Sequence, residues 1–116
     1  MYKSNRMFQV WRYTVSHHQL LLRSNKENSF PTRLEVLFKN VAFMAVPPVM
    51  RGVTITECGA AGDELPSFLN AFQISKPWYR IETEGAAGYI AAGAIVTNED
   101  DRGYEESSSL LSGPFL

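Results

Sequence analysis

The chain contains few of the residues from which a protein's chemistry is usually identified. Its 116 residues include one cysteine, Cys58, so no intramolecular disulfide can form, and no Asn-x-Ser/Thr acceptor occurs. The longest apolar run, Val41 to Met50, is interrupted by two prolines and is far shorter than the roughly 20 residues of a membrane-spanning helix. The first residues lead into no apolar signal region. We therefore expect a cytoplasmic protein with no membrane partner.

The composition is that of an ordinary globular protein. Apolar residues make up 45% of the chain, charged residues 20% and aromatic residues 12%, a balance that excludes disordered and low-complexity classes. A chain of this length buries enough surface to fold without metal or disulfide cross-links. We expect a single mainly-β domain over residues 1–106 and a flexible C-terminal tail over residues 107–116.

Short segments rich in aromatic and β-branched residues, separated by polar turns about every ten residues, predict strands. One short amphipathic segment, residues 63–70, predicts a helix that Asp63 would cap, with Pro66 in its first turn. The expected fold is mainly β, a small antiparallel barrel or sandwich of six to seven short strands with one short helix. The expected strands cover residues 7–15, 19–23, 32–46, 51–56, 78–83 and 89–96.

Two local signals refine this expectation. Ser16-His17-His18 separates the first two expected strands and predicts an antiparallel hairpin with a short polar turn. Within residues 32–46 the apolar alternation changes parity at Asn40, which predicts a bulge or tight turn because asparagine tolerates the left-handed conformation.

None of the potentially reactive motifs predicts an active site. Adjacent histidines on a strand point to opposite faces, and no further metal ligand lies near His17 and His18. Cys58 has no local nucleophile signature and is typical of a small buried side chain. The repeated Gly-Ala-Ala-Gly, at residues 59–62 and 85–88, lacks the lysine of a phosphate-binding loop. We expect no catalytic residue, no metal and no cofactor.

Charge is distributed unevenly along the sequence. Residues 1–56 contain eight Lys or Arg and two acidic residues, whereas residues 57–116 contain three Lys or Arg and ten acidic residues. Such segregation favours association with a protein partner or with further copies of the same chain, unless the strands of the two halves interleave and mix the charges. The leading hypothesis is a non-enzymatic protein–protein interaction or self-associating module.

Basic and aromatic residues alternate in the N-terminal half. This pattern gives the candidate binding residues and a second hypothesis, a weak single-stranded nucleic-acid binder, since bases stack on aromatic rings while cations follow the phosphates. The same rings could instead belong to the core. A third hypothesis, a small-ligand carrier or enzyme with a pocket in a small β-barrel, depends on the fold class alone. The candidate binding residues are Trp11, Arg12, Tyr13, Arg23 and Arg33.

Overall fold

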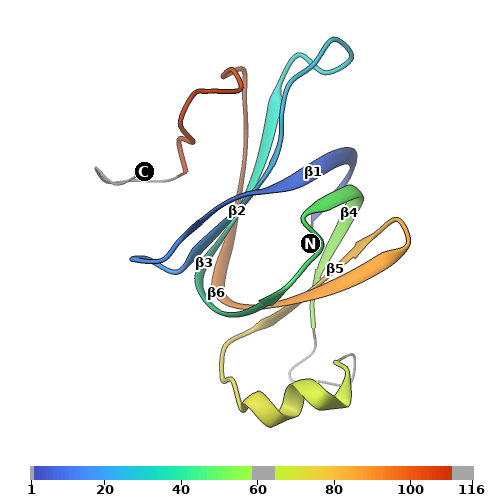
Figure 1. Ribbon diagram of the computed structural model, residues 1–116, viewed down its shortest axis with the longest axis vertical. Coiled ribbons are helices and arrows are strands. Elements are labelled where there is room, and N and C mark those ends of the chain that lie inside the picture. The colour runs from blue at the N-terminus through green and yellow to red at the C-terminus, as the bar shows by residue number, and fades with distance from the viewer. Residues whose placement is uncertain (1, 59–64, 111–116) are drawn as a thin grey trace.

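Six antiparallel strands form one closed ring in the computed structural model, which describes residues 2–58 and 65–110 (Figure 1). Their order around the barrel is β1-β2-β3-β6-β5-β4, and β4 closes the ring by pairing with β1. The strands are β1 (Tyr2–Thr14), β2 (Gln19–Ser24), β3 (Arg33–Ala45), β4 (Val49–Glu57), β5 (Trp78–Thr83) and β6 (Ala86–Asp100).

The expected mainly-β fold is confirmed, and of the two architectures the sequence allowed, the structure is the barrel. The expected helix is a short 3-10 helix, η1 (Ser67–Phe72), which Pro66 precedes. The cap expected at Asp63 lies outside the described residues. Among those residues no helix is long and apolar enough to cross a membrane.

Alternating side chains of all six strands fill the interior of the barrel. Phe8, Phe38, Ile81 and Ile90 are fully buried there, and Tyr79 packs edge-on against Phe38 at a ring distance of 5.6 Å. Each fully buried apolar side chain of this size stabilises the fold by roughly 1.5–3 kcal/mol. The interior is therefore a packed core.

In β1 and β3, the backbone becomes irregular where the alternation of apolar residues in the sequence changes parity. The pairing of β1 with β2 shifts between Val10 and Arg12, so Trp11 is the extra residue of a bulge. Because of that bulge, Val10 and Tyr13 both reach the core although they lie three residues apart. The expected irregularity at Asn40 is also confirmed, with a φ of 55° in the left-handed region.

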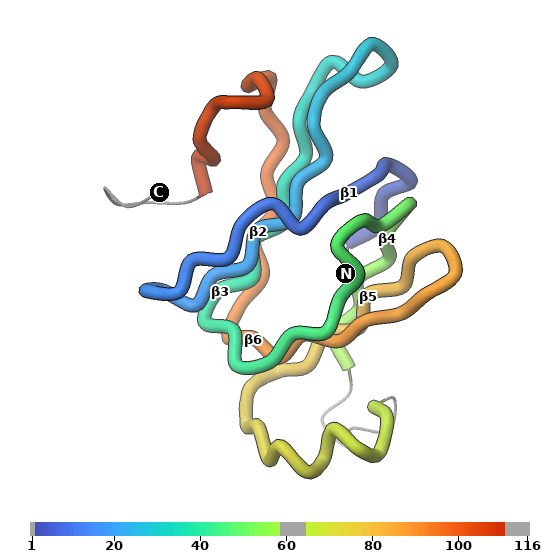
Figure 2. The backbone as a smooth tube through the Cα atoms, viewed as in Figure 1, coloured from blue at the N-terminus to red at the C-terminus, as the bar shows by residue number. Residues whose placement is uncertain are grey.

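The hairpin of β2 and β3 extends beyond the ring as an arm (Figure 2). The buried Arg6 guanidinium holds both sides of its base, donating to the carbonyl oxygens of Ser24 at 3.3 Å and Thr32 at 2.6 Å. The same guanidinium lies 4.5 Å from the centre of the Phe30 ring. One cation on β1 thus fixes the direction of the arm.

The segment after β6, residues 101–110, turns back over the outside of β2 and β3 (Figure 1). Outward-facing Leu21 and Leu37 are consequently buried, although they belong to no part of the barrel core. Ser108, at the start of the expected flexible tail, is buried as well, while residues 111–116 lie outside the described part of the chain. The outer face of the β2–β3 pair therefore has its own covering layer.

Candidate functional site

The candidate residues from the sequence do not form one exposed face. Trp11, Arg12 and Arg23 line a hollow of about 130 Å³ together with Tyr104 and neighbouring residues of the C-terminal segment. Tyr13 packs against the barrel core, and its hydroxyl hydrogen-bonds His18 Nδ1 at 3.2 Å. Arg33 and Arg23 are buried, so these two positions present no basic surface to the solvent.

Both buried arginines are held by carboxylates. Arg23 donates from Nε and Nη2 to one oxygen of Glu35, at 3.0 and 2.8 Å. Arg33 Nε lies 3.1 Å from Asp100 Oδ1, and its Nη2 lies 3.8 Å from the other oxygen of Glu35. Two cations and two anions thus neutralise each other beneath the C-terminal segment.

The remaining donors of the cluster hold the C-terminal segment in place. Arg33 Nη1 donates to the main-chain oxygens of Gly103 at 3.1 Å and Glu106 at 2.7 Å. Ser108 Oγ donates to Glu35 Oε1 at 2.8 Å. The two arginines therefore bind the protein's own backbone, which explains physically why they are not available to a phosphate.

Trp11 is likewise covered by the protein. The Arg23 guanidinium lies 4.6 Å from the centre of its ring, and Tyr104 meets it edge-on at 4.9 Å. A base could not stack on the face of Trp11 that Arg23 occupies. Of the three candidate arginines only Arg12 is exposed, and the geometry does not favour a nucleic-acid interface here.

The cluster makes the stability of the fold depend on pH through Asp100. Burial acts to raise the pKa of Asp100, but hydrogen bonds from the Arg102 backbone and the Arg33 side chain, with the charges of both arginines, outweigh it and lower the pKa below its usual value. A lowered pKa means that the unfolded chain binds the proton more tightly, so this stabilisation is complete above about pH 5 and is lost as the pH falls through the folded-state pKa.

Asp100→Asn tests this linkage. We expect the variant to have a smaller free energy of unfolding than the parent at pH 7, by about 1–3 kcal/mol, because a charge-assisted hydrogen bond is lost. The difference should shrink as the pH falls below about 5, through the ordinary aspartate pKa and on through the lower pKa of the folded state, where the parent carboxylate becomes protonated as well. Urea unfolding at several pH values measures it, and a difference that stays constant over this range would contradict the assignment.

Charges of the two sequence halves mix in space. Lys3 and Arg51 line a hollow of about 370 Å³ together with Glu82 and Glu84. On the β2–β3 arm, Lys26 Nζ donates to the Asp101 carbonyl oxygen. Basic and acidic residues that are separated in the sequence thus lie next to each other in the fold, as expected if the strands of the two halves interleave. Charge alone therefore gives little support to self-association.

The histidine pair lies in the β1–β2 turn, where Ser16 Oγ is 3.0 Å from His17 Nδ1. Within residues 2–58 and 65–110, no three His, Cys, Asp or Glu side chains come together as a group able to hold a metal ion. Cys58 is buried at the end of β4, where its main-chain N–H donates to the Trp78 carbonyl at 2.8 Å.

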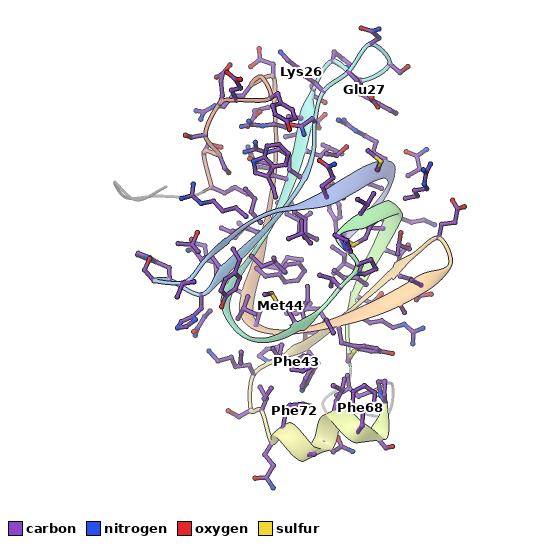
Figure 3. The ribbon with its side chains drawn as sticks, viewed as in Figure 1. Lys26, Glu27, Phe43, Met44, Phe68 and Phe72 are labelled. Atoms are coloured by element: carbon purple, nitrogen blue, oxygen red, sulfur yellow. The ribbon has the colours of Figure 1, made fainter. Side chains whose placement is uncertain are left out.

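Aromatic side chains gather at the end of the barrel where η1 lies (Figure 3). The Phe43 ring on β3 packs between Phe72 of η1 at 4.9 Å and Trp78 of β5 at 5.4 Å. On η1, Phe68 is 65% exposed and Phe72 53%. Met44 pairs with the core residue Ile90 and therefore leaves β3 on the opposite face from Phe43. These four side chains, Phe43, Phe68, Phe72 and Trp78, are called the aromatic patch below.

The sequence contained a signal for this patch that hydrophobic alternation does not detect. Residues 41–50 and 65–75 include no charged residue, and the fold places parts of both segments at the same end of the barrel. Depletion of charge is typical of the centre of a protein interface. The sequence alone could not place the two segments at the same end of the barrel, because it does not show that η1 packs beside β3.

Comparison with known proteins finds no matching family model, no matching curated protein and no matching solved structure.

Proposed function

We propose that the protein is a non-enzymatic self-associating module in which two copies pack together through the aromatic patch. The observation that carries the proposal is the exposure of Phe68 and Phe72 on η1, beside the contacts of Phe43 with Phe72 and Trp78. Exposed apolar groups of this size, gathered in one place, mark interaction sites on soluble proteins. Aromatic residues are enriched at such interfaces.

The absence of charge in the two segments that build the patch favours a second copy as the occupant. A two-fold interface places each surface against its own duplicate, so a charge near the axis would face a like charge. Segments 41–50 and 65–75, which supply all of the patch except Trp78, contain no such charge, so most of the patch can face itself without electrostatic cost. It also offers no ion-pair partner to a charged peptide, which makes a strongly charged partner a poor match.

Phe68→Glu should convert the self-associated protein into a monomer. The substitution places a carboxylate in the patch of each copy, where association would have to remove it from water and bring it towards its duplicate. We expect at least a tenfold weaker dimerisation in sedimentation equilibrium. Phe68 makes no ring contact among the described side chains, so the fold of the monomer should be retained.

Val15→Glu is the matched control. Val15 is 72% exposed in the β1–β2 turn, outside the patch, and the same change there should leave the oligomeric state unaltered. Raising the salt from about 0.1 to 1 M, which shortens the Debye length from about 10 to 3 Å, should not dissociate an apolar interface. A parent protein that is monomeric at high concentration, or a dimer that salt dissociates, would overturn the proposal.

A further inference from the structure

A second candidate site is a hollow at one mouth of the barrel. It has a volume of about 210 Å³ and lies between the start of β1, the end of β4, the start of β5 and the second half of β6. Ile55 and Tyr79 are buried beneath it. The residues that line it are Tyr2, Ile55, Glu57, Tyr79, Ile95 and Thr97, none of which belongs to the aromatic patch.

Side chains that face the barrel interior are apolar in the core but polar at this mouth, and this change produces the hollow. Glu57 pairs with Tyr79 in the β4–β5 register, so both side chains leave the sheet on its inner face. Thr97 follows the inward-facing Ile95 by two residues on β6. At this mouth, just beyond the apolar core, a carboxylate, a phenol and a hydroxyl thus face the same space.

Among the described residues, Glu57 is the only charged side chain in the lining. Burial, followed by the neighbouring Glu57 carboxylate and the hydrogen bond to it, raises the pKa of Tyr79, so its hydroxyl stays protonated and acts as a donor. Burial also raises the pKa of Tyr2, with Glu99 adding to the effect and Arg6 opposing it. The lining therefore has one negative charge and two neutral phenol rings at neutral pH.

The cationic side chains near this mouth either bind other groups or line a neighbouring hollow. The Arg6 guanidinium is occupied by Ser24, Asn25 and Thr32 at the base of the arm. Lys3 lines an adjoining hollow of about 470 Å³, which shares Tyr2 and Thr97 with the first. Among the described residues no cation forms an ion pair with Glu57.

We propose that this mouth binds a small organic ammonium ion with a compact apolar body, its charged nitrogen directed at Glu57 and its body against Ile55, Ile95 and the tyrosine rings. Cations are attracted to the faces of aromatic rings as well as to carboxylates. The volume lies below the roughly 300–1,000 Å³ of pockets for drug-sized molecules, which restricts the ligand to the size of a single substituted ring or a short branched chain. This site goes beyond the proposed self-association and does not depend on it.

Benzylamine is a suitable probe, with benzyl alcohol and benzoate as neutral and anionic molecules of similar shape. Titration followed by amide chemical shifts should show benzylamine binding in the millimolar range or tighter, with shifts centred on Ile55, Tyr79 and Ile95. Both comparison molecules should bind at least tenfold more weakly, because neither offers a cation to the carboxylate. Equal binding of all three molecules, or an absence of shifts at these residues, would overturn the proposal.

Glu57→Gln separates the charge from the shape of the site. The amide preserves the volume and an oxygen acceptor for Tyr79, so the fold should be retained while benzylamine affinity falls about tenfold or more. Glu84→Gln, at an exposed turn position outside the lining, removes the same charge and should have little effect. Unchanged binding in Glu57→Gln would contradict the assignment. Phe68→Glu should bind benzylamine like the parent, so failure of the proposed dimer would not be mistaken for failure of this site.

Discussion

Glu35→Ala should lower the free energy of unfolding by about 3–5 kcal/mol, the usual cost of removing one partner from a buried ion pair. Both oxygens of Glu35 are engaged, one by Arg23 and the other by Ser108 and, at longer range, Arg33. Without this carboxylate, the two arginine side chains, 3% and 0% exposed, would face each other with only Asp100 to offset them. Because small domains are stable by only about 5–15 kcal/mol, much of the stability depends on this one residue.

Chemical denaturation of Glu35→Ala and Glu35→Gln separates the charge from the packing. The amide retains the volume and an acceptor for Ser108 but not the charge, so its loss should be smaller than that of the alanine variant. Glu105→Ala removes an exposed carboxylate from the same covering segment and should change the free energy of unfolding by less than about 0.5 kcal/mol. If Glu35→Ala cost no more than Glu105→Ala, the cluster would not be a stabilising element of the fold.

Gly88→Ala should destabilise the barrel by about 3 kcal/mol, at the upper end of the usual cost of overpacking. A Cβ at this position would lie 2.4 Å from the Ala45 carbonyl oxygen and 3.2 Å from the Val46 Cα, both main-chain atoms that no rotamer change can move. Relief would require β6 to separate from the end of β3. These two strands share the longest pairing in the molecule, which runs to Ala45 and Tyr89 beside the substituted position.

Gly103→Ala is the appropriate comparison for this substitution. The nearest atom to a Cβ there is a Glu106 side-chain oxygen at 3.6 Å, an ordinary contact, so its thermal midpoint should remain within a few degrees of the parent's. For a domain of this size, 1 kcal/mol corresponds to a shift of roughly 4–8 °C in Tm. A Gly88→Ala protein with the same Tm as the parent would show that β3 and β6 do not approach each other as closely as in the structure.

Local patterns were sufficient for most of the strands, because alternation and turn residues act over a few positions. Asn40 is an example: its break in parity predicted the irregularity that its φ of 55° confirms. Arg23 and Arg33 show where such reasoning ends. Their parity points them out of the barrel, but the residues of the C-terminal segment that they bind lie 81 positions away for Arg23 and 70 for Arg33. The one local clue was apolar Leu21 and Leu37 on the same outward face, which indicates a covered surface.

The aromatic patch and the barrel mouth were beyond sequence reasoning for a related reason. Phe43 and Phe72 come from distant segments, and Glu57 and Thr97 meet only because the ring closes. A sequence that allows either a barrel or a sandwich does not specify which strand ends share a mouth. The two candidate sites thus form only when the barrel closes, whereas each strand can be predicted without knowing that the barrel closes.

The strand order also bears on how the chain reaches this structure. β6 is the last strand in the sequence, yet it lies between β3 and β5 in the ring. The first four strands can form a curved sheet, but its two outer edges stay open until β5 and β6 are added. Closure must therefore wait for contacts between residues more than 50 positions apart, such as Leu37 with Val96. Such non-local pairing slows folding, and on a ribosome the barrel could not close before β6 had left the exit tunnel.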